Sequence, residues 1–317
     1  MTFIDSLRNY LSPQILVILC LGFISGVPYG VLMDPLNYWL SEEGIEKSTI
    51  GLLSLVFLIY SLKVFWAPLV DRLKIPRLHR LGQRKSWLFL SQFVTGLIIL
   101  SISFVEPKES LNIFVYLILA IGFFSATQDI CADALRIELV EKRELGEASA
   151  VFVIGWRIGA ILLSGVATFY LAEFFGWNFA YQMIGIIVIF LSFIFLILIK
   201  EPTREIRPPK DFFKEPLGWF EDSFLAPLKD LYLRYKNHLL LLLLLIFTYR
   251  LSDMFLGPMA MPFYRETGFT KIEVAEITNF YGLIMTILGG LFAGASVYRF
   301  GLSKNLVAGA ILTPLTN

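Results

Sequence analysis

Cysteine and histidine are scarce in this 317-residue chain, which contains two of each. Cys20 and Cys131 both lie in apolar stretches, and neither His79 nor His238 has a second ligand-type residue at metal-binding spacing. Zinc sites need clustered ligands, and disulfide frameworks need several cysteines at regular spacing. We therefore expect no disulfide framework, no metal site and no cofactor.

The chain also lacks an excess of charge, since its net charge is only +1. Nothing in this balance indicates nucleic-acid binding, and we expect no nucleic-acid partner. There is no Gly-x-Ser-x-Gly elbow, no phosphate-binding loop and no nucleophile close to a histidine. We expect a protein that is not an enzyme. A membrane-embedded enzyme acting on lipid stays as the alternative, with His79 as its only candidate residue.

Apolar residues dominate instead: 56% of the chain is hydrophobic, 15% is aromatic, and the mean hydropathy is +0.70. Uninterrupted apolar runs of about 18 residues or more indicate membrane-spanning helices. The pattern predicts an all-α integral membrane protein with eight full transmembrane helices and the start of a ninth near Asn305. The eight runs cover residues 15–33, 50–70, 87–105, 111–131, 150–172, 180–199, 239–263 and 276–297.

Basic residues are divided unequally between the two sets of loops that these spans define. One set, which includes the N-terminus and the long loop after residue 199, holds 20 Lys and Arg, and the other set holds 4. Cytoplasmic loops carry the excess of basic residues. The opening segment, MTFIDSLRNYLSPQ, has neither a basic leader nor a small-residue cleavage site. We expect a multi-pass protein of the cell inner membrane with a cytoplasmic N-terminus.

The spacing of the spans predicts two helical bundles joined by a charged loop. Residues 1–199 form a six-helix bundle, residues 200–237 a cytoplasmic linker, and residues 238–317 an incomplete second bundle. The linker mixes Phe, Trp and Leu with charge at roughly helical spacing, which favours an amphipathic helix on the membrane surface over a disordered linker. Membrane lipid is therefore an expected partner.

The two halves resemble each other in the outer part of their first helices. The first span contains GFISGVPYG and the seventh contains FLGPMAMPF, so each places Gly and Pro at a matching position. Gly/Pro-interrupted spans in corresponding positions of two halves are typical of transporters with internal repeats.

The loop after the second span, APLVDRLKIPRLHRLGQRK, resembles the signature loop of the major facilitator superfamily. Asp71, Arg72 and Arg84 match its acidic and basic positions, although Ala67 stands where the signature has glycine. A second, weaker copy, GASVYRFGLSK, carries Arg299. The resemblance implies a role for these four residues in the inner gate.

The closer resemblance is to AmpG-type muropeptide permeases within that superfamily. It is carried by GFISGVP, KVFWAPLVDR, SATQDICADA, GWRIGAILLSG and YRLSDMF, which cover nearly every span. It implies import of GlcNAc-anhydroMurNAc and its peptides by proton symport. Acetyl-CoA or another small solute is the alternative cargo. Such families have twelve or more spans, so a non-transporting remnant of a split gene, or a chain that transports poorly alone, is also an open hypothesis.

Four charged residues inside the spans are candidates for a functional site, because intramembrane charges are costly and usually paired. At about 1.5 Å per helical residue, Asp129, Asp133, Lys63 and Arg157 all fall in the cytoplasmic third. We expect them to form one network of two acids and two bases. It is either a structural ion-pair cluster or a proton-coupling site, and the residues alone leave both interpretations open.

The second half offers a separate candidate near the membrane midplane. Arg250 and Asp253 lie three residues apart in the seventh span, where Arg250 suits a substrate carboxylate. A local Arg–Asp pair is the alternative. We further name Gln128, Tyr29, Tyr60, Trp156 and Tyr281 as candidate contacts for a sugar, with helix packing as the alternative for each.

Overall fold

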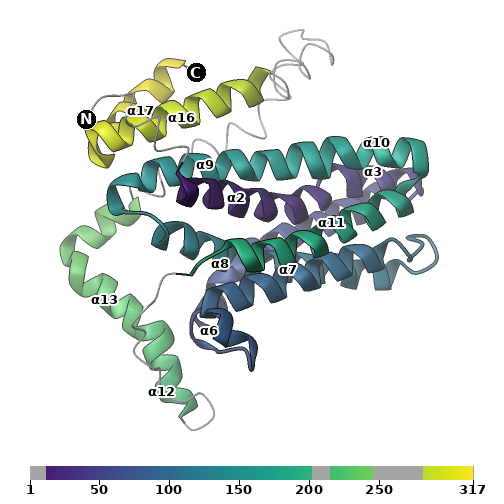
Figure 1. The fold of residues 1–317 in the computed structure, drawn as a ribbon, viewed down its shortest axis with the longest axis horizontal. Helices are drawn as coiled ribbons and strands as arrows, with labels where there is room; N and C mark the ends of the chain where they lie inside the picture. Colours follow the sequence, from purple (N-terminus) through teal and green to yellow (C-terminus); the bar gives the residue numbers. More distant parts are fainter. Residues whose placement is uncertain (1–11, 202–214, 245–246, 248–280, 317) are drawn as a thin grey trace. The chain divides into compact units, whose positions relative to one another are not determined.

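The computed structural model describes residues 12–201, 215–244, 247 and 281–316, which are mostly helical and contain no strand (Figure 1). Contacts divide the chain into two compact units. The first consists of Met1–Glu205 with Ala293–Arg299, and the second of Ile206–Phe292 with Phe300–Asn317.

Six apolar helical segments of the first unit are long enough to cross a membrane. The helices are α2 (Pro13–Val31), α3 (Asp34–Glu42), α4 (Lys47–Leu53), η1 (Ser54–Phe57), α5 (Leu58–Leu62), η2 (Lys63–Phe65), α6 (Ala67–Arg72), η3 (Leu78–Leu81), α7 (Gln83–Ile102), α8 (Leu111–Glu138), η4 (Lys142–Glu144), α9 (Leu145–Arg157), η5 (Ile158–Ala167), α10 (Thr168–Phe175) and α11 (Trp177–Leu198).

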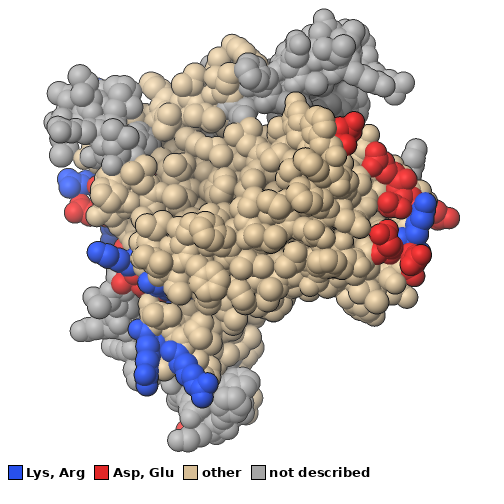
Figure 2. Space-filling model, turned by 45° about the vertical axis from the view of Figure 1, so that its right-hand side comes forward, with Lys and Arg blue, Asp and Glu red and all other residues tan. Residues whose placement is uncertain are grey.

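Most charged side chains of this unit lie near the ends of the spans, and Lys63, Asp129 and Arg157 are exceptions. Figure 2 shows a wide band of uncharged side chains and a cluster of acidic side chains at one end. Ion pairs and hydrogen bonds join the connections at that end, for instance Lys108 to Glu43 at 3.8 Å and Trp177 to Glu42 at 2.6 Å. An uncharged band between charged ends is what a lipid bilayer requires, so the chain is a multi-pass membrane protein.

Glycines allow α2 and α9 to touch through their backbones. A Cβ atom on Gly26 would collide with the Trp156 carbonyl oxygen, and one on Gly155 would collide with the carbonyl oxygen of Leu19. Gly22 and Gly159 stand in the same relation to the facing helix. Membrane helices gain their contact by close packing of small residues, because lipid supplies no hydrophobic force between them.

The core of the unit is built on aromatic and aliphatic side chains from all six segments. Trp39 is 1% exposed and packs against Phe114, Trp177 and Tyr181 at ring distances of 4.9 to 6.1 Å. Tyr181 donates its hydroxyl proton to the carbonyl oxygen of Val31 at 3.1 Å, which satisfies a polar group in a dry environment.

The second span differs from the continuous helix that its apolar run predicts. Between residues 47 and 72 the backbone alternates between α-helix and short 3₁₀ segments, η1 and η2. The fifth span is interrupted in another way, by the π-helical segment η5, where Ser164 donates to the carbonyl oxygen of Val27 at 2.7 Å. Such irregular turns leave backbone groups for other partners and often occur at functional sites.

The remaining helices are α12 (Pro216–Phe220), η6 (Glu221–Leu225), α13 (Ala226–Tyr235), η7 (Lys236–His238), α16 (Gly282–Phe300) and α17 (Leu302–Thr316). They belong to the second unit except for residues Ala293–Arg299 of α16, which belong to the first. Helix α16 overlaps the eighth span predicted at residues 276–297. Most of the predicted seventh span, residues 239–263, lies outside the described residues. The linker is helical over residues 216–235, as its amphipathic pattern indicates.

Alanine at Gly26 or Gly155 is expected to destabilise the protein, because its methyl group would overlap a carbonyl oxygen of the facing helix. Overpacking of this kind costs about 1–3 kcal/mol. Thermal unfolding of the detergent-purified chain, followed by tryptophan fluorescence, should show a lower melting temperature for each variant.

Gly51→Ala is the matched control, since Gly51 is also helical but a Cβ there meets no atom within 4 Å. Alanine is the better helix former by about 1 kcal/mol, so this variant should melt no lower than the parent. Equal melting temperatures for all three variants would contradict the close contact of α2 with α9.

Candidate functional site

Lys63 lies between two carboxylates of α8. Its Nζ atom is 3.2 Å from Oδ2 of Asp133 and 3.6 Å from Oδ2 of Asp129. The exposed fractions of the side chains are 28% for Lys63, 18% for Asp129 and 41% for Asp133. The ammonium group therefore compensates two negative charges on a mostly apolar helix.

The helical repeat of α8 explains why one lysine reaches both acids. Residues four apart lie on the same face of an α-helix, so Asp129 and Asp133 stand one above the other. Lys63 begins η2 on the facing span, with Tyr60 one turn earlier. Asp133 has a further partner in Arg136, at 3.3 Å on the same helix.

Arg157 does not join this network. Within the described part of the chain it forms no ion pair, and its Nε atom is buried without a hydrogen-bond partner. The expected arrangement of two acids with Lys63 and Arg157 is therefore wrong in one member: Lys63 and Arg136 are the bases that contact the acids. Arg157 is the last residue of α9 and places its guanidinium group there.

Three of the predicted aromatic residues lie together. The Tyr29 ring centroid is 5.2 Å from that of Tyr60 and 5.1 Å from that of Trp156. The Tyr60 hydroxyl donates to Oγ of Ser125 at 2.8 Å, one turn before Asp129 on α8. An aromatic layer from α2, α5 and α9 thus adjoins the segment of α8 that carries the acids.

The Gln128 side chain contacts a neighbouring helix and is not exposed to a substrate cavity. It is fully buried, and its Nε2 atom donates to the carbonyl oxygen of Ile24 at 3.0 Å, which ties α8 to α2. Trp66 makes a comparable tie, since its indole donates to Oγ1 of Thr127 at 3.0 Å. The sequence offered no sign of the Trp66 contact, because both residues have the composition of ordinary span residues.

A second charged cluster closes the end of the bundle where the second and third spans meet. Arg84 is 6% exposed and contacts Oδ1 of Asp71 at 3.3 Å and Oε2 of Glu138 at 2.7 Å. Glu201 accepts from the backbone N–H groups of Arg84 and Lys85 at the start of α7. The predicted loop signature thus contains an ion pair between the buried Arg84 and the partly exposed Asp71, while Arg72 is in the last turn of α6.

Other predicted residues fall elsewhere. Arg250 and Asp253 lie outside the described residues. Tyr281 is 57% exposed, and Arg299 lies in the last turn of α16. Sequence reasoning missed Glu147, a fully buried acid of α9 that precedes the apolar run. No group of three or more metal-ligand side chains occurs within the described segments.

Known proteins resemble this chain over nearly its whole length. The model of the Major Facilitator Superfamily matches residues 17–316. The AmpG 4 protein of Rickettsia conorii is 39% identical over 302 residues, which cover 95% of this chain and 71% of that protein. The anhydromuropeptide permease of Escherichia coli strain K12 is 33% identical over 312 residues, which cover 98% of this chain and 61% of the permease.

The chain belongs to the major facilitator superfamily. The resemblance to AmpG-type proteins that the span motifs predict is confirmed, as is the prediction of a helical membrane protein. Membership of this family, together with a relative named as a permease, implies that the chain is a transporter.

Lys63→Met is expected to destabilise the protein more than Asp129→Asn does. Without Lys63 the Asp129 carboxylate loses its counter-ion in an apolar span, whereas without Asp129 the lysine still contacts Asp133. Stranding a partly exposed charge should cost about 1–3 kcal/mol. Thermal unfolding in detergent measures the difference, and Lys63→Met/Asp129→Asn should recover part of the loss.

Lys108→Met is the control, because Lys108 is 62% exposed and its pair with Glu43 spans 3.8 Å. Exposed pairs contribute about 0–1 kcal/mol. If Asp129→Asn proves at least as destabilising as Lys63→Met, Lys63 is not the centre of the cluster.

Proposed function

We propose that this protein is a secondary transporter that imports cell-wall muropeptides, GlcNAc-anhydroMurNAc and its peptides, by proton symport. The observation that carries the proposal is the 33% identity to an anhydromuropeptide permease over 98% of the chain. The charged cluster and the aromatic layer beside it support it, because a symporter of sugar-peptides needs a titratable group and flat apolar surfaces near one another.

In this proposal Asp129 is the proton acceptor. A proton on Asp129 removes its charge and with it the attraction to Lys63, which then keeps Asp133 as its partner. The cluster thus has two arrangements that differ by one proton. Tyr29, Tyr60 and Trp156 offer ring faces for a sugar. Arg157 and Arg250 are the bases proposed for the anionic groups of the substrate.

The proposed architecture has two bundles, residues 1–199 and 238–317, with a linker at residues 200–237 on the cytoplasmic side of the inner membrane. It counts eight full spans and the start of a ninth, with a cytoplasmic N-terminus. The unequal distribution of Lys and Arg between the loops supports this orientation.

The linker helix is proposed to lie on the membrane surface. Its apolar side chains recur every three or four residues, and those on the stripe include Leu217, Phe220, Leu228, Leu231 and Tyr235, each more than a third exposed. Asp230 and Arg234 pair with each other at 2.7 Å on another face. An amphipathic helix with a bare apolar stripe places that stripe among the lipid acyl chains.

In proteoliposomes the chain is expected to accumulate radiolabelled GlcNAc-anhydroMurNAc-peptide when the outside is made acidic, and to stop when a protonophore is added. Asp129→Asn should reduce accumulation to the protonophore level but keep exchange of labelled for unlabelled substrate, since exchange needs no net proton movement. Filtration assays of accumulation and of exchange measure the difference between the two activities.

Glu109→Gln, an exposed carboxylate at the acidic end, should change neither activity. Uptake that ignores the protonophore would contradict symport. Saturable uptake of labelled acetyl-CoA, without saturable uptake of labelled muropeptide, would instead favour the alternative cargo.

A cysteine at Leu228 labelled with an environment-sensitive dye is expected to report an apolar surrounding in proteoliposomes, because Leu228 lies on the apolar stripe. Nitroxide lipids should quench it. Asp230→Cys, about 200° further around the helix, is the matched control and should report water. Both variants are made after Cys20 and Cys131 are replaced by serine. Equal emission and equal quenching at the two positions would contradict a surface-bound helix.

A further inference from the structure

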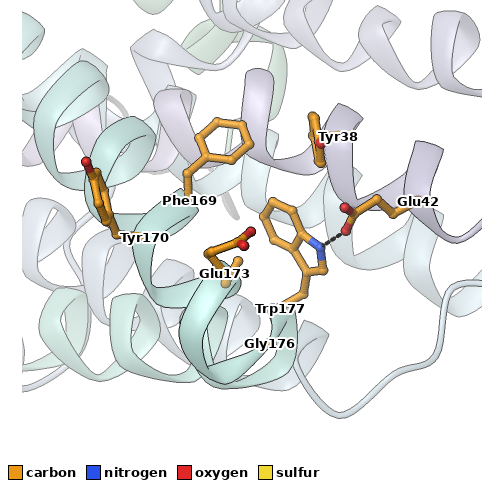
Figure 3. A pocket seen from close by; sticks show the side chains of 8 residues that line it. Tyr38, Glu42, Phe169, Tyr170, Glu173, Gly176 and Trp177 are labelled. Atoms are coloured by element: carbon orange, nitrogen blue, oxygen red, sulfur yellow. Dashed lines mark hydrogen bonds between the residues drawn. The ribbon is translucent and has the colours of Figure 1, made fainter.

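A cavity of about 500 Å³ opens at the acidic end of the first unit, between α3, α10 and the start of α11. Aromatic rings of Tyr38, Phe169 and Trp177 lie together in its wall, with ring centroids 5.4 to 6.0 Å apart (Figure 3). Volumes of about 300–1,000 Å³ are typical of small-molecule sites. The cavity is therefore large enough for an organic ligand.

Two carboxylates belong to the same cavity, Glu42 from α3 and Glu173 from α10. The indole of Trp177 donates to Oε2 of Glu42 at 2.6 Å, which fixes one carboxylate against an aromatic ring. Figure 3 shows Glu173 projecting from α10 toward the same indole. All eight residues that line the cavity in the described structure are either uncharged or acidic.

The acidic residues around the cavity favour a cationic ligand. Figure 2 shows that acidic side chains gather at this end of the bundle. Besides Glu42 and Glu173, four glutamates belong to the helix ends and connections there, namely Glu43, Glu46, Glu106 and Glu109, and Lys108 pairs with Glu43. A cleft of one sign of charge concentrates ligands of the opposite sign. Anions are disfavoured here, and neutral molecules gain nothing from the field.

The cavity is distinct from the Lys63 cluster. Asp129 lies eighteen residues along α8 from Leu111, the end of that helix next to the connection that carries Lys108. At about 1.5 Å per residue this is roughly 27 Å.

We propose that this cavity binds an organic ammonium group. Aromatic faces attract a cation through the ring quadrupole, and a carboxylate beside them neutralises its charge; aromatic cages for quaternary ammonium use the same combination of surfaces. The ammonium belongs either to a free solute or to the headgroup of phosphatidylethanolamine, since the cavity is open at the end of the membrane-spanning helices.

Binding of choline to the purified full chain in a non-ionic detergent tests the proposal by isothermal titration calorimetry. Choline should bind at least about tenfold more tightly than 3,3-dimethylbutan-1-ol, its neutral isostere. Glu173→Gln should weaken choline binding by about tenfold, and Tyr170→Leu, at an exposed ring of the wall, should weaken it too.

Glu109→Gln is the matched control, because it removes the same charge from the same end of the bundle but outside the cavity. It should leave choline binding nearly unchanged. Absence of choline binding, equal binding of choline and its isostere, or an equal effect of Glu109→Gln and Glu173→Gln would each overturn the proposal.

Nanodiscs distinguish the two sources of the ammonium group. If the lipid headgroup is the natural ligand, choline binds more weakly in phosphatidylethanolamine discs than in phosphatidylglycerol discs, and Glu173→Gln removes the difference. If the ligand is a free solute, the parent chain binds choline equally in both discs.

Discussion

Backbone contact between α2 and α9 is the constraint on which the rest of the first unit depends. Because glycines on both helices have no side chain, backbone carbonyl oxygens of each helix lie directly against the backbone of the other. This contact fixes the distance between the two helix axes. Tyr29 on α2 and Trp156 on α9 meet as a consequence. Helix α8 is then attached to α2 through the Gln128 side chain, and with it the acids that face Lys63. Packing thus determines the position of the chemistry.

Two basic residues of this bundle, Lys63 and Arg84, each lie where other helices supply acidic partners. Lys63 on the second span serves two acids of the fourth, and Arg84 on the third serves acids from the second and fourth. Partly buried pairs of this kind add little net stability, because the cost of removing the charges from water offsets their attraction. Their value is that they specify which helices meet, and they make that meeting sensitive to protonation.

Much of this was accessible from the sequence, and the exceptions have physical causes. Hydropathy located all six spans of the first unit, and four-residue spacing placed Asp129 and Asp133 on one face. Helix α8 runs to Glu138 instead of stopping near Cys131, because its last charged residues are paired inside the bundle rather than hydrated. Arg157 was assigned wrong partners because equal depth does not determine the direction in which a side chain points. For Gln128 the sequence left a sugar contact and a helix contact open, and the structure shows a hydrogen bond to the Ile24 carbonyl oxygen of a neighbouring helix.

The 3₁₀ turn at Ser54–Phe57 has a geometric effect on everything that follows it in the second span. Each of its four residues advances about 120° around the axis rather than about 100°, so the lower part is rotated by about 80° relative to an unbroken α-helix. This rotation changes the direction of both Tyr60 and Lys63, and both side chains contact α8. The direction in which the Lys63 side chain points around the helix axis is thus determined by Ser54–Phe57, about a turn and a half earlier in the chain, although these residues make no contact with Asp129 or Asp133.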